Sequence, residues 1–226
     1  MRGFIVMAMF AVSLSHAGSR EYSEVRNLEL DASGLSEIFI DAGAGSMVVS
    51  GVEGSNEITV VATIRVDTDD AGEGAEFVEK RLRLDLERDG DRAELEAGFT
   101  PGWGWGSEAA VDLDVRMPAR LALVIDDGSG PITVDAVSGA VRIDDGSGPI
   151  ELRNPGDVDI DDGSGSIRLE NAGAVNGENG EDDPLYGQVE EVAAQCLDDF
   201  TLEYTLRETA AFFPSIVSMW INWAEP

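Results

Sequence analysis

Histidine, lysine and cysteine are almost absent from this chain. Its 226 residues contain one histidine (His16), one lysine (Lys80) and one cysteine (Cys196). A single cysteine cannot form a disulfide within the chain, so stability has to come from packing. Because His16 lies in a stretch that we expect to be removed, histidine-dependent catalytic triads and His-ligated zinc sites are excluded from the mature chain.

Basic residues and aromatic residues are also scarce. The chain has 15 Lys and Arg against 45 Asp and Glu, which gives a formal net charge of −30, and its aromatic content is 7%. This charge argues against binding to nucleic acid or to an anionic membrane through a basic patch. The low aromatic content favours a core of stacked Val, Ile, Leu and Ala.

The first residues resemble a secretory signal. Arg2 supplies a positive start, residues 4–14 form a short apolar run, and Ser15-His16-Ala17 provides a cleavage site of small residues. The apolar run is too short to span a bilayer. We therefore expect cleavage near Ala17/Gly18 and an exported protein, periplasmic or extracellular, that does not cross the membrane.

The phrase Ile-Asp-Asp-Gly-Ser-Gly occurs three times, beginning at Ile125, Ile143 and Ile160, which are 18 and 17 residues apart. Each copy is followed by a short run in which apolar residues alternate with polar ones, as strands require. A unit this small cannot bury its apolar face alone, so the repeats must stack on one another. The sequence therefore predicts an all-β fold, a β-solenoid that resembles a right-handed parallel β-helix.

Weaker patterns precede and follow the repeats. Residues 40–49 contain a degenerate copy, Asp41-Ala-Gly-Ala-Gly, and a small insert at about 67–107 has a helix at 75–82 and a hairpin at 82–97. We divide the chain into a signal (1–17), a solenoid domain (18–176) and a divergent tail (177–226). The tail is either a cap over the open end of the solenoid or partly disordered.

The order of these features resembles the bacterial DUF4097 family of adhesin-like domains. The residues that carry the resemblance are the Asp41-Ala-Gly-Ala-Gly turn, the helix and hairpin at 75–97, the run from Val111 to Pro118 and the three repeats. The resemblance covers roughly residues 24–176. It implies an exported β-helix-like domain, and the family supplies no catalytic residue to carry over. The tail after Asn176 departs from the family pattern.

The acidic pair in each repeat is the sharpest candidate for chemistry. If successive turns stack at about 4.8 Å, Asp126, Asp144 and Asp161 form one column, and a second column forms beside it from Asp127, Asp145 and Asp162. Ca²⁺ accepts several carboxylate oxygens and would relieve the repulsion. Alternatively, one column caps turn amides while the other faces water. We predict no metal and no other cofactor, with calcium at these six residues as the alternative.

Trp103 and Trp105 lie in a glycine-rich loop, where they could contact a ligand or fold over the core as a lid. The sequence favours an exported, non-catalytic domain for envelope-associated or adhesin-like binding or scaffolding, whose partner is an unknown envelope protein or glycan. The alternatives are a calcium-binding β-solenoid and a polysaccharide-active enzyme that uses Asp127, Asp145 and Asp162. The ligand and the oligomeric state stay open.

Overall fold

The computed structural model describes residues 21–100 and 109–179. The predicted signal, Trp103 and Trp105, and nearly all of the divergent tail lie outside these residues. The described part contains one helix and fourteen strands, which form two sheets of seven strands. The prediction of an all-β fold is confirmed at this level. Among the described residues, no helix has the length and apolar character needed to cross a membrane.

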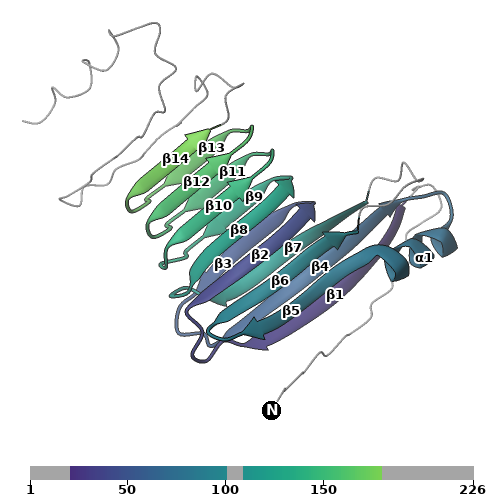
Figure 1. The fold of residues 1–226 in the computed structure, drawn as a ribbon, viewed down its shortest axis with the longest axis horizontal. Coiled ribbons are helices and arrows are strands. Elements are labelled where there is room, and N and C mark those ends of the chain that lie inside the picture. Colours follow the sequence, from purple (N-terminus) through teal and green to yellow (C-terminus); the bar gives the residue numbers. More distant parts are fainter. Residues whose placement is uncertain (1–20, 101–108, 180–226) are drawn as a thin grey trace, which may run out of the picture.

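The two sheets lie one behind the other (Figure 1) and enclose a single apolar core. The first sheet has the order β1-β4-β7-β3-β9-β11-β13 and the second has the order β14-β12-β10-β8-β2-β6-β5. The first-sheet strands are β1 (Glu21–Asp31), β4 (Glu57–Asp67), β7 (Ala109–Pro118), β3 (Met47–Val52), β9 (Ile132–Asp135), β11 (Ile150–Arg153) and β13 (Ile167–Glu170). The second-sheet strands are β14 (Val175–Asn179), β12 (Val158–Asp162), β10 (Val141–Asp145), β8 (Ala122–Ser129), β2 (Glu37–Ala44), β6 (Arg92–Phe99) and β5 (Leu82–Asp89).

From β8 onward the chain passes back and forth between the two sheets. Each strand pairs in parallel with the strand two further along the chain, and identical repeat positions fall opposite one another, as Ile125, Ile143 and Ile160 do. The apolar residues of each strand are buried between the sheets. The degenerate copy belongs to the same stack, because Ile40 pairs with Ile125 and Met47 pairs with Ile132.

The amino-terminal part is built differently from the repeats. β1 and β4, β4 and β7, and β5 and β6 pair antiparallel, so both sheets are mixed. The hairpin at 82–97 forms as predicted, with Gly90 at a φ of 64° in its turn. The parallel pattern therefore covers only part of each sheet.

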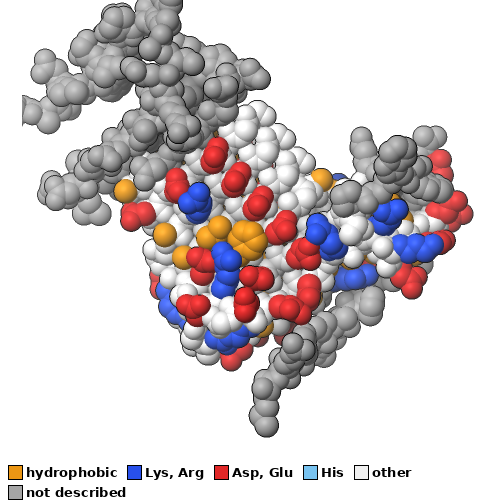
Figure 2. Space-filling model, viewed as in Figure 1, with side chains coloured by type: hydrophobic (Ala, Val, Ile, Leu, Met, Phe, Trp, Pro, Cys, Tyr) orange, Lys and Arg blue, Asp and Glu red, His pale blue; other side chains and the backbone are white. Residues whose placement is uncertain are grey.

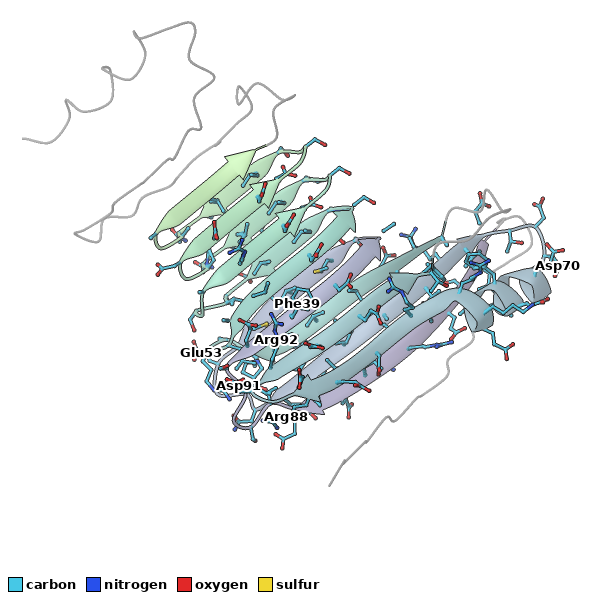
Figure 3. All side chains as sticks on the ribbon, in the orientation of Figure 1. Phe39, Glu53, Asp70, Arg88, Asp91 and Arg92 are labelled. Atoms are coloured by element: carbon cyan, nitrogen blue, oxygen red, sulfur yellow. The ribbon has the colours of Figure 1, made fainter. Side chains whose placement is uncertain are left out.

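The helix α1 (Ala71–Arg81) begins earlier than its apolar pattern indicated. The Asp70 side chain caps it by accepting hydrogen bonds from the backbone amides of Gly72, at 2.7 Å, and of Glu73, at 3.2 Å. Asp70 lies at the end of the molecule away from the repeats (Figure 3). Residues 71–74, which precede the helix predicted at 75–82, are thus helical as well, because a cap can start a helix before its apolar pattern begins.

We expect Asp70→Ala to destabilise the protein by about 0.5–2 kcal/mol, since two amides of the first helical turn lose their acceptor. Urea unfolding followed by circular dichroism measures this loss. Asp70→Asn is the matched control, because asparagine is an equally good cap and should keep the free energy of unfolding near that of the parent. Equal losses in both variants would contradict the capping role.

Candidate functional site: the acidic corner of the repeats

The two aspartates of each repeat point to opposite sides of the second sheet. Strand alternation continues to the end of β10, so Ile143 is buried, Asp144 is exposed and Asp145 is buried again. The same holds for the repeats on β8 and β12. The two predicted columns therefore exist as in-register rows. We call the exposed line of acidic residues that includes Asp126, Asp144 and Asp161 the outer row. We call the buried line of Asp127, Asp145 and Asp162 the inner column.

The outer row extends beyond the repeats to every strand of the second sheet. The register places one acidic residue on each strand, namely Asp85, Glu96, Asp41, Asp126, Asp144, Asp161 and Glu178. Figure 2 shows acidic side chains lined up across this face. Asp85, Glu96 and Glu178 carry no repeat motif, so sequence reasoning missed them, and only the strand pairing reveals them.

On the repeat strands of the first sheet, the outward glutamates are paired with arginines. On the repeat strands β11 and β13, Arg153 lies 2.5 Å from Glu151 and Arg168 lies 3.0 Å from Glu170. The acidic residues of the second sheet have fewer cations nearby, although Arg83 pairs with Glu96 and Arg142 lies 3.4 Å from Asp159. The negative charge of the repeats is therefore concentrated on the second sheet.

Beside the outer row, the middle of the same face carries a small apolar area. Phe39 on β2 pairs in register with Val124 on β8, and both side chains are half-buried. The guanidinium carbon of Arg92 lies 4.7 Å from the centroid of the Phe39 ring (Figure 3), a cation–π contact. The second sheet thus presents an aromatic ring and an arginine next to a line of carboxylates.

The inner column is nearly excluded from solvent. Asp127 is 5% exposed, Asp145 is 2% exposed and Asp162 is 0% exposed. One oxygen of each of the last two accepts a hydrogen bond from a turn amide: Ser147 donates to Asp145 at 3.2 Å, and Ser164 donates to Asp162 at 3.1 Å. These aspartates form the corners by capping the backbone two residues ahead, as the simpler alternative predicted.

Burial and mutual repulsion change the acidity of the inner column. Burial, together with the charge of Asp145, raises the pKa of Asp127 to about 7. Burial, together with the charge of Asp162, raises the pKa of Asp145 to about 6, although hydrogen bonds from turn amides oppose this rise. In the outer row, burial and the charges of Asp144 and Asp41 raise the pKa of Asp126.

The calcium alternative meets an unfavourable geometry in this arrangement. A calcium ion takes six to eight oxygen ligands at once, but the six predicted aspartates are divided between two sides of the sheet. Across residues 21–100 and 109–179, no group of three or more His, Cys, Asp or Glu side chains is placed to hold a metal ion. The corner is thus arranged as two long rows rather than as one cage.

The arrangement also bears on enzymatic chemistry. Glycoside cleavage uses two carboxyl groups with different environments, one acid and one base or nucleophile. The inner aspartates that the enzymatic alternative would use are shut away from solvent, and the outer ones repeat with strand spacing. Neither row forms a single irregular cluster of the kind that holds one substrate. The predicted ligand contacts Trp103 and Trp105 lie beyond the described residues.

The fold and the corner define a mainly β protein of two mixed sheets with stacked acidic repeats. No protein-family model matches the chain, and no curated protein has a significant sequence match. The resemblance to the DUF4097 family therefore stays a prediction.

Two solved structures are similar in part to the chain. A putative cell adhesion protein from Clostridium sporogenes has a TM-score of 0.30 and 12% identity, over 71% of this chain and 74% of its own. A putative adhesin from Parabacteroides distasonis has a TM-score of 0.31 and 14% identity, over 69% of each chain. At this level of similarity, neither structure assigns a family or a function to this protein.

Proposed function

We propose that this protein is an exported, non-catalytic binding or scaffold module of the cell envelope, adhesin-like in its action, whose partner is an envelope protein or glycan. The observation that carries the proposal is the pattern of polar groups in the repeats: they form rows, with one side chain per strand, on open sheet faces. Such rows suit contact with an extended partner, whereas catalysis needs a few groups that converge on one point.

The repeat region belongs, in this proposal, to the β-solenoid class. Two features support it: successive strands alternate between the sheets, and each strand pairs in parallel with the strand one coil later. The right-handed sense of the winding is part of the same proposal. In such a fold the length of the stack sets the length of the binding face, so repeats serve to extend a surface.

The face of the second sheet is the surface that we assign to the partner. It combines the outer row with the half-buried Phe39 and with Arg92, and aromatic residues and arginine are enriched where proteins bind one another. Its excess of carboxylates favours a partner with positive charge at the contact, and such an attraction weakens as salt is added. Export is supported by the predicted signal in residues 1–17.

A binding experiment with two charge-matched variants tests the proposal. Purified protein is mixed with isolated envelope fractions, and sedimentation measures the bound share at low and at high salt. The test variant is Asp126→Asn with Asp144→Asn and Asp161→Asn. The control variant removes the same charge from the first sheet through Asp135→Asn, Glu151→Gln and Glu170→Gln.

We expect the parent and the control to bind one fraction in a salt-dependent manner, and the test variant to bind at least about tenfold more weakly, a change of about 1.4 kcal/mol. Equal weakening in both variants would mean that net charge, and not the second sheet, drives binding. Retention of the unprocessed chain inside the producing cell, or release of reducing ends from a polysaccharide, would contradict the exported, non-catalytic role.

A further inference from the structure

We infer that the inner column is a proton-holding ladder, in which Asp127 and Asp145 take up protons, so that the stacked repeats tighten in acid and loosen as the pH rises. The inference begins from geometry. The three carboxyl groups lie on adjacent parallel strands in register, at one corner of the stack. All three side chains are more than nine-tenths buried.

Two carboxyl oxygens of the ladder have no hydrogen-bond donor. The Oδ2 atoms of Asp127 and Asp145 are buried and accept no hydrogen bond from any described residue. A buried carboxylate oxygen without a donor is costly, because the charge has lost its water and gained nothing in return. A proton on one carboxyl group removes a charge. It also supplies a donor that can reach toward the carboxyl oxygen on the neighbouring strand.

The surroundings of Asp127 and Asp145 offer no positive charge within the described residues. In the register of the second sheet, Asp127 pairs with Ala42 on β2, and Asp162 pairs with Asn179 on β14. The charged residues nearest in sequence are Asp126, Asp144 and Asp161 of the outer row, which add negative charge rather than positive charge. Across the core, the first sheet turns apolar residues inward, namely Ile132, Val134, Ile150, Leu152, Ile167 and Leu169.

The charged residues of the elements packed around the ladder face outward. On the first sheet these are Glu151, Arg153, Arg168 and Glu170, which pair among themselves, and on the second sheet they are Arg142 and Asp159. An arginine on the far side of a sheet does not neutralise a carboxylate inside it. A proton is therefore the counter-charge that the ladder can take up without rebuilding the corner.

The acidity of the ladder agrees with this geometry. The raised pKa values, about 7 for Asp127 and about 6 for Asp145, mean that the folded protein binds protons that the unfolded chain has released. Such groups stabilise the fold fully below the ordinary pKa of an aspartate, and this contribution is lost as the pH rises through the folded pKa. Stability should thus fall with rising pH up to about 7 and then level off.

The scarcity of histidine makes this pH range easy to interpret. Ordinary carboxyl groups are ionised above about pH 5.5, and the only histidine is His16, in the predicted signal. Between that pH and 7, few groups other than the ladder titrate. Each proton that the folded protein holds and the unfolded chain has released should raise the unfolding equilibrium constant about tenfold per pH unit.

The test compares urea unfolding of the parent, Asp145→Asn and Asp144→Asn at several pH values between 5 and 8. Asparagine at 145 keeps the oxygen that accepts from Ser147, carries no charge, and brings a donor for the neighbouring rung. We expect this variant to lose the part of the pH dependence that comes from Asp145, together with the part of the Asp127 contribution that rests on the charge of Asp145. The Asp144→Asn control, which removes the same charge one residue away on the exposed side, should keep most of it.

A direct measurement covers the case in which Asp145→Asn does not fold. Titration of the parent by carboxyl-carbon NMR should show at least two aspartates with midpoints above the ordinary range. Midpoints that are all ordinary, or equal flattening in both variants, would overturn the inference. A calcium-induced rise in stability at pH 8 that Asp145→Asn abolishes and Asp144→Asn retains would also overturn it, because the ladder would then hold a cation.

Discussion

Gly148→Ala should prevent folding or reduce the free energy of unfolding by more than about 4 kcal/mol. Gly148 is the second glycine of its repeat, with a φ of 148°, and a Cβ added there would lie 2.0 Å from the carbonyl oxygen of Gly130 in the coil before. The oxygen that the Cβ would meet belongs to the backbone, so no side chain can move aside. The amide of Gly148 also donates a hydrogen bond, at 3.0 Å, to the carbonyl oxygen of Ser164 in the next repeat. A backbone shift at Gly148 would break this bond between stacked repeats.

The control for this variant is Gly54→Ala. Gly54 also has a positive φ, 70°, but nothing lies within 4 Å of the position of its Cβ. Alanine at this site should cost only the conformational strain of about 1–2 kcal/mol. The comparison, measured by urea unfolding, separates close stacking of coils from backbone strain. If both variants lost the same stability, the coils would not approach each other as closely as the structure shows.

Ile143→Ala should cost about 2–5 kcal/mol, the range for removing a large buried aliphatic side chain. Ile143 is 1% exposed and lies between Ile125 and Ile160 in the parallel register, so its loss leaves a cavity between two coils. The neighbours cannot close the cavity, because the backbone hydrogen bonds of three strands fix their spacing. Since domains are stable by about 5–15 kcal/mol in total, this variant should have a clearly lower melting temperature.

Arg142→Ala is the matched control on the same strand. Arg142 points outward and its ion pair with Asp159 is exposed, so its loss should change stability by about 1 kcal/mol or less. Chemical unfolding measures both variants. A larger loss for Arg142→Ala than for Ile143→Ala would contradict the placement of the core between the sheets.

The repeats could be derived from the sequence because their signals are local and agree with one another. Alternation of apolar residues marks the strands, and Asp-Gly-Ser-Gly marks the corners where Gly130 and Gly148 adopt positive φ. Even the degenerate copy at Asp41 could be aligned, and it pairs with Asp126 as the alignment requires. The start of α1 was misjudged because an apolar pattern locates the buried face of a helix, whereas the cap at Asp70 fixes its first turn.

The acidic site could be derived only in part. The spacing of the motif indicated two aspartate columns, but it left open which column faces the core, and the structure shows that this is the column of Asp127, Asp145 and Asp162. The extension of the outer row to Asp85 and Glu96 was not accessible, because it depends on the hairpin β5–β6 lying in register beside β2. Pairing between distant segments leaves no periodic signal in either one.

The sequence by itself determined that the chain builds stacked strands with a glycine corner in each repeat, and that its one histidine, His16, lies in the predicted signal. These properties follow from residue type and spacing alone. Only the tertiary structure decided that the amino-terminal strands pair antiparallel, that the outer row spans the second sheet, and that Asp127 and Asp145 are shut away from water. Each of these depends on which surfaces two sheets turn toward each other, and burial and acidity are properties of that arrangement rather than of a motif.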